Sequence, residues 1–204
     1  MGSSGGSSGG GGITGLQAAQ YSRHGPLDFS HFGMSAMTGD PVGFSNASTV
    51  NAQDWFTRLW IPAGFTVSGI YLALANAGVW DAATTGNALA LYDDGGTLTD
   101  SIPVDDTYWQ TAGWRGAALS GGTIAAQTSG RFVYACAKIR GYAGTPPAFA
   151  FANSAGDRVY QYTGPATTKR RTFYQAAAAT FPATINPAST GTATGYAYLI
   201  GLLS

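Results

Sequence analysis

The stretch RFVYACAKI, residues 131–139, decides the fold class of this 204-residue chain. It is a short, almost continuous apolar run that is rich in residues favouring strands, so it predicts a strand in the middle of a sheet. Cys136 lies inside this run and is the single cysteine of the chain. A buried free thiol behaves as a small hydrophobe, so we expect a structural role for Cys136 and no disulfide framework.

Similar segments extend on both sides of this strand, separated by turn residues. Further strands are predicted at residues 55–61, 66–77, 113–120, 147–153, 157–163 and 195–203, with two more in 87–98 around the hairpin signal Asp94-Gly95. Turn signals every ~8–12 residues are typical of two packed antiparallel sheets. The sequence therefore predicts an all-β, jelly-roll-like antiparallel β-sandwich over residues 53–204.

The chain ahead of residue 53 has a different character. Residues 1–12 are Gly and Ser after Met1, which predicts a flexible coil or an expression tag. Residues 13–52 carry scattered aromatics between Gly and Pro, with one short helix expected at 15–25. We interpret 13–52 as an extended Gly-rich arm that anchors the sandwich to partners. Its apolar anchors are Ile13, Leu16, Tyr21 and Phe32.

Charge is sparse and balanced. Charged residues make up 10% of the chain, the formal net charge is zero, and every acidic residue is Asp. A basic footprint for nucleic acid or for an anionic membrane is therefore missing. Neither an apolar run of ~20 residues nor a signal-peptide pattern occurs, so we expect no membrane partner. A weakly charged surface suits a protein packed in an assembly, and we expect a homo-oligomer.

Few residues suggest chemistry. His24 and His31 lack the convergent partners of a zinc site or a catalytic triad. Asp93-Asp94 has the composition of a hairpin turn, and adjacent carboxylates on a strand point to opposite faces, which disfavours a glycosidase pair. Calcium at Asp105-Asp106 is an alternative with too few ligands. The basic cluster TKRR (168–171) is interpreted as a solvated or interface loop. We predict no catalytic residue, no metal and no cofactor.

The most suggestive surface candidate is the aromatic segment TYWQTAGWRG, residues 107–116. Tyr108, Trp109 and Trp114 could form flat stacking surfaces for a sugar or a protein receptor, and Arg115 could add a polar contact. Aromatic residues of a β protein also commonly belong to the core, and this alternative stays open.

Two further patterns concern packing. Trp55 and Trp60 stand at odd spacing on one predicted strand, so they should face opposite sides of the sheet, one toward the core and the other toward an interface. The stretch RRTFYQAAAATFPATINP (170–187) is interpreted as a long connection or a short helical turn, in which Pro182 and Pro187 give a rigid lead-in to the closing strand.

From Trp55 to Leu203 the chain resembles the terminal β domain of minor tail, fibre and head-fibre proteins of actinobacteriophages. The resemblance rests on LWIPAGFTVSGIYLALANAG, GNALALYDDGGTL, YWQTAGWRGAAL, SGRFVYACAKI, GTPPAFAF and FPATINPA ahead of GYAYLIGLL. Phe181 stands where Leu is usual in the family's LPATI motif, and the long fibre is missing. The resemblance implies a virion structural protein, often trimeric, on the tail or capsid surface with other virion proteins as partners.

Three functional hypotheses follow. The leading one is a non-enzymatic minor tail, tail-tip or fibre protein that anchors by its arm and displays the sandwich, with host-surface glycan as a candidate ligand. A capsid decoration or head-fibre protein is the first alternative, and a carbohydrate-binding module is the second. A hydrolase is the weakest interpretation, because the chain carries no catalytic motif.

Overall fold

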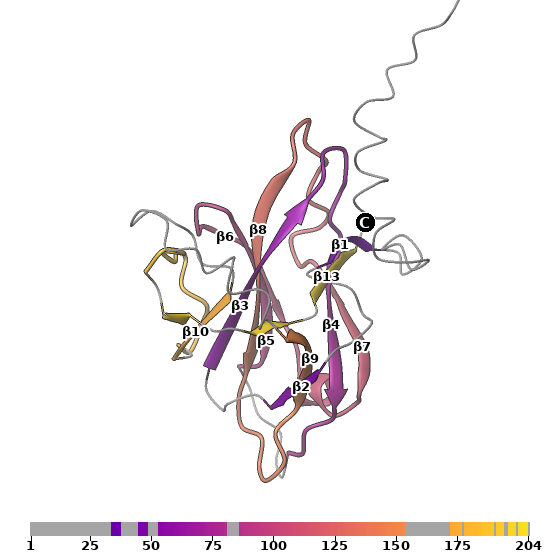
Figure 1. Cartoon of the computed structure of the whole chain (residues 1–204), viewed down its shortest axis with the longest axis vertical. Coiled ribbons are helices and arrows are strands. Elements are labelled where there is room, and N and C mark those ends of the chain that lie inside the picture. Colours follow the sequence, from indigo (N-terminus) through magenta and orange to yellow (C-terminus); the bar gives the residue numbers. More distant parts are fainter. Residues whose placement is uncertain are drawn as a thin grey trace, which may run out of the picture.

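The computed structural model describes residues 34–37, 45–48, 53–80, 86–153, 172–176, 178–189, 191–193, 196–198 and 200–203. These residues form two antiparallel sheets that lie face to face (Figure 1). The predicted all-β antiparallel sandwich is confirmed. The Gly/Ser segment, the expected helix at 15–25, both histidines, the expected strand at 157–163 and the basic cluster at 168–171 lie outside the described residues.

One sheet has six strands in the order β11-β10-β3-β8-β5-β6 and lies at the left of Figure 1. Its strands are β3 (Gln53–Ile61), β5 (Ala88–Asp93), β6 (Leu98–Pro103), β8 (Arg131–Ile139), β10 (Thr172–Ala176) and β11 (Thr192–Ala193). The deciding run RFVYACAKI is β8, which pairs with β3 along its whole length and with β5 on its other side. Its central place is the one that its apolar sequence predicts.

The other sheet has seven strands. They are β1 (Met34–Met37), β2 (Ser45–Ser48), β4 (Gly69–Asn76), β7 (Gly113–Ala118), β9 (Ala148–Asn153), β12 (Tyr196–Tyr198) and β13 (Ile200–Leu203). The main path runs β1-β13-β4-β9-β12, while β7 pairs with β4 and β2 pairs with β9. The closing segment is thus shared between two partners, since β12 pairs with β9 and β13 with β4.

Two strands come from the segment interpreted as an arm. β1 pairs with β13, and β2 pairs with β9, so residues 34–37 and 45–48 belong to the sandwich. Each strand has only four residues, which is too short for an alternating pattern to reveal it. The four expected anchors, Ile13, Leu16, Tyr21 and Phe32, lie outside the described residues.

The inter-sheet core follows from alternation along the strands. Trp55, Leu59 and Ile61 of β3 point inward, as do Val133, Ala135, Ala137 and Ile139 of β8 and Ile70, Leu72 and Leu74 of the facing β4. Trp55 is buried while Trp60 is 46% exposed, which confirms that the two tryptophans face opposite sides of the sheet.

The six-stranded sheet is also covered on its outer face. We call residues 178–189 the strap, and we call the apolar group that the strap forms together with the outer face of the sheet the outer cluster. The outer cluster consists of Phe56, Ala88, Ala90, Tyr92, Tyr134, Cys136, Phe173, Phe181 and Ile185. Phe56 and Phe173 stack at 4.5 Å between ring centroids, and Tyr92 meets Phe181 edge to face at 6.4 Å. The strap thus adds a third layer over part of the sheet, in yellow at the left of Figure 1.

This layer corrects the interpretation of residues 170–187. Thr172–Ala176 is strand β10, which pairs with β3, and no helical turn forms in the described part of the alanine run. The following FPATINP covers the outer cluster, because Phe181 and Ile185 are each more than nine-tenths buried there. Pro187 lies in a turn that the bond from Ser189 N to Asn186 O closes at 3.0 Å, so the expected rigid extended lead-in does not continue through Pro187.

Hydrogen bonds fix the strap at the β5–β6 turn. Leu98 N donates to Ala183 O at 2.9 Å, and Ile185 N donates to Gly96 O at 2.8 Å. Tyr92 Oη donates to Pro182 O at 3.0 Å. Gly96 has φ +90°, and a Cβ on it would lie 2.1 Å from Ile185 O, so only glycine lets the strap approach this closely.

Candidate functional site

Two of the aromatic residues proposed as a ligand platform are in the core. Tyr108 and Trp109 lie on the short 3-10 helix η3 (Asp106–Trp109) and are 7% and 0% exposed. Trp109 packs edge to face on Phe149 at 5.9 Å. The interpretation of Tyr108 and Trp109 as exposed stacking surfaces is therefore wrong, because neither ring presents a face to solvent.

The structure brings Tyr108 and Arg115 together as a packing unit. Tyr108 Oη donates to Arg115 O at 2.6 Å, and Arg115 Nε donates to Tyr108 O at 3.1 Å. These bonds join η3 to β7, which also carries the half-buried Trp114. Burial raises the pKa of Tyr108 well above its usual value. Tyr108 and Arg115 therefore hold two elements together, while the exposed residues between them, 110–113, carry no aromatic side chain.

One member of each aspartate pair, Asp93 and Asp105, serves the backbone. Asp93 Oδ1 accepts from Thr97 N at 2.8 Å, which confirms the hairpin turn. Asp105 caps η3, since its Oδ1 accepts from Tyr108 N at 3.1 Å and from Thr107 Oγ1 at 2.5 Å. The bond from Thr107 is the main cause of the lowered pKa of Asp105. Within the described ranges, three or more His, Cys, Asp or Glu residues nowhere gather as a metal site would require.

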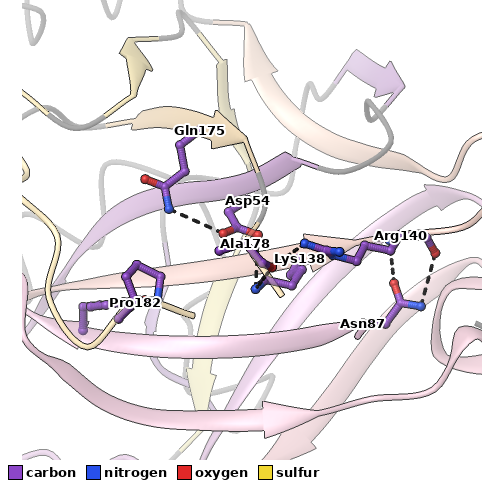
Figure 2. Close-up of polar contacts among 8 residues, drawn as sticks. Asp54, Asn87, Lys138, Arg140, Gln175, Ala178 and Pro182 are labelled. Carbon is purple, nitrogen blue, oxygen red and sulfur yellow. Dashed lines mark hydrogen bonds and ion pairs between the residues drawn. The ribbon is translucent and has the colours of Figure 1, made fainter. Parts of the chain in front are cut away.

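A buried ion pair lies under the strap (Figure 2). Asp54 of β3 and Lys138 of β8 are opposite each other in register, with 3.8 Å between Oδ1 and Nζ and at most 1% exposure of either side chain. Lys138 Nζ donates to Ala178 O at 2.8 Å and lies 4.2 Å from the centre of the Phe181 ring. Gln175 Nε2 donates to Asp54 Oδ2 at 3.4 Å. The lysine thus ties the start of the strap to the sheet.

Burial dominates the electrostatics of this pair. It raises the pKa of Asp54 to about 6, against the opposing effect of the Lys138 charge. It also lowers the pKa of Lys138, against the charge of Asp54. Each partner is therefore harder to keep ionised than in water. Sequence analysis missed this pair, although a lone lysine inside the apolar run RFVYACAKI is the signal that could have revealed it.

Arg140 and Asn87 extend the polar cluster past the end of β8 and the start of β5 (Figure 2). Arg140 Nη2 donates to Ala178 O, so one carbonyl of the strap accepts from two cations. Asn87 Oδ1 accepts from Arg140 N at 2.8 Å, and Trp80 Nε1 donates to Arg140 O at 2.9 Å. These contacts hold the end of β8 against the loops before β5.

A pocket of about 450 Å³ lies beside this cluster. Its lining combines Lys138 with Asn87, Ser101, Asp105, Thr180 and Phe181. Lys138 contributes little accessible surface, because its ammonium group is already engaged by Asp54 and Ala178. The arrangement therefore suits structural support better than proton transfer.

The opposite end of the same face is open. Arg58, Trp60, Asp94 and Phe132 form what we call the aromatic ledge. Trp60 and Phe132 are 46% and 37% exposed and meet edge to face at 4.7 Å. The guanidinium carbon of Arg58 lies 3.8 Å from the centre of the Phe132 ring. Arg58 Nε and Nη2 donate to Asp94 Oδ1 at 2.9 and 2.6 Å.

Packing fixes the orientation of the ledge. A Cβ on Gly130 would lie 2.2 Å from the Trp60 ring, so the indole rests directly against the Gly130 backbone. Phe132 is held by the guanidinium of Arg58, which Asp94 in turn orients. The ledge is therefore a preformed surface. The sequence did not single it out as a ligand site, because the exposure of Trp60 and Phe132 depends on where the strap ends.

Comparisons with known proteins add no assignment. No protein-family model matches the chain, and no curated protein matches it. None of the helices in the described part of the chain has the length and apolar character needed to cross a membrane.

Proposed function

We propose that the chain is a non-enzymatic structural component of a bacteriophage virion, a minor tail, tail-tip or fibre protein that displays its β-sandwich outward. The observation that carries the proposal is where the resembling segments lie. LYDDGG forms the end of β5 and the β5–β6 turn, RFVYACAKI is the central β8, and FPATINP lies in the strap fixed to that hairpin. The motifs on which the resemblance to tail and fibre domains rests are thus the elements that build this three-layered arrangement.

The polar residues support a structural role. Asp54 and Lys138 come closest to a catalytic pair, yet both are buried, and Lys138 is also bonded to the strap. Asp93 and Asp105 are engaged in a turn and a helix cap. The sparse charge of the chain suits close packing against other subunits.

Immunogold labelling of the encoding phage tests this proposal. Antibody against the β-sandwich is added to purified virions, and the gold is located by electron microscopy. Gold at the tail or tail tip is the expected result. Gold over the head would replace the tail assignment by a decoration or head-fibre role, and particles without gold would overturn the virion assignment.

Anchoring by the N-terminal segment has its own test. Removal of residues 1–32 leaves β1 and β2 in place and deletes Ile13, Leu16, Tyr21 and Phe32. We expect the truncated protein to fold, with a cooperative urea unfolding transition, and to be absent from particles. Incorporation at normal occupancy would contradict the anchoring role.

A further inference from the structure

We propose that the aromatic ledge is a carbohydrate-binding site that takes a neutral pyranose unit of a surface glycan. This inference rests on the proposed function for the source of the glycan, since a displayed virion domain meets the host envelope. It moves the candidate ligand contact from residues 108–115 to the other sheet.

The rings provide the apolar half of such a site. Trp60 is nearly half exposed on a strand that buries most of its other side chains, and Phe132 stands beside it at 4.7 Å. The face of an aromatic ring is negative and attracts the weakly positive C–H groups of a sugar ring. Because Gly130 supports the indole, the ring is held in place before a ligand arrives.

Arg58 and Asp94 provide the polar half. Their side chains remain 21% and 33% exposed, so ligand hydroxyl groups can approach both. A guanidinium has five N–H donors, and two nitrogens of Arg58 face Asp94. The two charges cancel across 2.6 Å, which leaves a neutral donor and acceptor pair. Such a surface matches an uncharged polyhydroxyl ligand better than a phosphate or a polyanion.

The extent of the ledge also favours a sugar over a second protein chain. Two residues along β8 from Phe132, Tyr134 pairs with Tyr92 of β5, and both tyrosines are fully buried. The exposed apolar surface therefore ends at these two tyrosines. A stable protein interface needs about 800 Å² on each partner. Two rings flanked by an ion pair fit one or two sugar units.

The test uses the full chain and a panel of neutral oligosaccharides: maltohexaose, cellohexaose, mannohexaose and chitohexaose. Isothermal titration measures binding to the unaltered protein, to Trp60→Ala and to Trp114→Ala. Trp114 lies on the other sheet and serves as the matched control. We expect at least one sugar to bind with a Kd of ~1 mM. Trp60→Ala should weaken this binding by about tenfold or more, and Trp114→Ala should leave the Kd unchanged.

A second measurement locates the ligand without relying on a binding defect. The indole N–H signals of the unaltered protein are followed by NMR, with the Trp60 signal assigned by its loss in Trp60→Phe. Addition of the bound oligosaccharide should shift the Trp60 signal and leave that of the buried Trp109 in place. This readout holds even where Trp60→Ala fails to fold.

Three outcomes would overturn the proposal. One is no binding by any panel sugar at ~10 mM. Another is binding that Trp60→Ala retains. The third is a self-associating protein that becomes monomeric in Trp60→Ala by analytical ultracentrifugation, which would make the ledge a contact between copies. Labelled virions without sugar binding would remove only this site, and sugar binding without labelled virions would remove only the virion role.

Discussion

Two ion pairs lie on the outer face of the same sheet, and they differ in almost every respect. Asp54–Lys138 is at most 1% exposed, spans 3.8 Å and lies under the strap. Arg58–Asp94 is 21% and 33% exposed, spans 2.6 Å and lies beyond the strap. Asp54 and Arg58 point the same way from one strand, so only the cover distinguishes the two ends. Coverage makes one pair a structural support and leaves the other open to a ligand.

The largest expected effect comes from removing the covered cation. Lys138→Met leaves Asp54 buried without its partner and Ala178 O with one donor fewer, so we expect a loss of about 3–5 kcal/mol in the free energy of unfolding by urea. The double variant Asp54→Asn with Lys138→Met should lose less, since no lone charge is left. A Lys138→Met loss as small as that expected for an exposed pair would show that the strap makes no difference to what the ion pair contributes to stability.

The pH dependence of Asp54 gives the next effect. Its pKa is raised from 3.8 to about 6, so the folded state keeps a proton that the unfolded chain releases in this window. The contribution of Asp54 to stability therefore falls as pH rises from about 4 to about 6, by on the order of 3 kcal/mol. Asp54→Asn lacks this titration. The difference in unfolding free energy, unaltered protein minus variant, should fall across the window. A rising difference would mean that Lys138 outweighs burial.

Loosening the strap should expose the outer cluster to solvent, as the aromatic ledge already is. Gly96→Ala forces a Cβ against Ile185 O at φ +90°, so we expect a loss of about 2 kcal/mol and a lifted strap. Cys136 is fully buried in the outer cluster and should then react faster with a thiol reagent such as dithionitrobenzoate. Gly122→Ala, with φ +86° and open space around it, is the control for backbone strain alone. Equal thiol rates in both variants would show that the strap does not cover Cys136.

The smallest effect belongs to the open end. Arg58→Met removes an exposed pair and the contact with Phe132, and we expect a loss of about 1 kcal/mol or less in urea unfolding. Raised salt should shrink the difference further, whereas it should change the Lys138→Met loss little. A loss comparable to that of Lys138→Met would show that the ledge is a part of the structural core.

The local sequence pattern predicted the strands and the two packed sheets, but it did not predict the third layer that the strap forms. RFVYACAKI, WFTRLWI and the Asp94-Gly95 hairpin carry their structure in adjacent residues, and each forms as expected. The strap could not be recognised as a covering layer, because its apolar residues are few and its partners on the β5–β6 hairpin lie some eighty to ninety residues earlier in the chain. An extended run with two prolines has the same sequence pattern whether it is covered or free.

The candidate ligand contact was misplaced for a related reason. The 108–115 segment and the ledge both combine Trp, an aromatic neighbour and Arg, so composition does not separate them. Contact with Phe149 and with β7 buries Tyr108 and Trp109, while the end of the strap leaves Trp60 uncovered. Both outcomes depend on residues distant in sequence.

The position of β13 has a kinetic consequence. This strand lies between β1 and β4, and Ile200 pairs with Leu72 while Leu203 pairs with Met34. The seven-stranded sheet therefore becomes complete only after segments from both ends of the described chain have paired. The entropy cost of closing the long loop between these segments must be overcome before their contacts can stabilise the fold. Folding should accordingly be slow, in the range of milliseconds to seconds, and the amides of β4 and β13 should exchange with solvent together, through global opening.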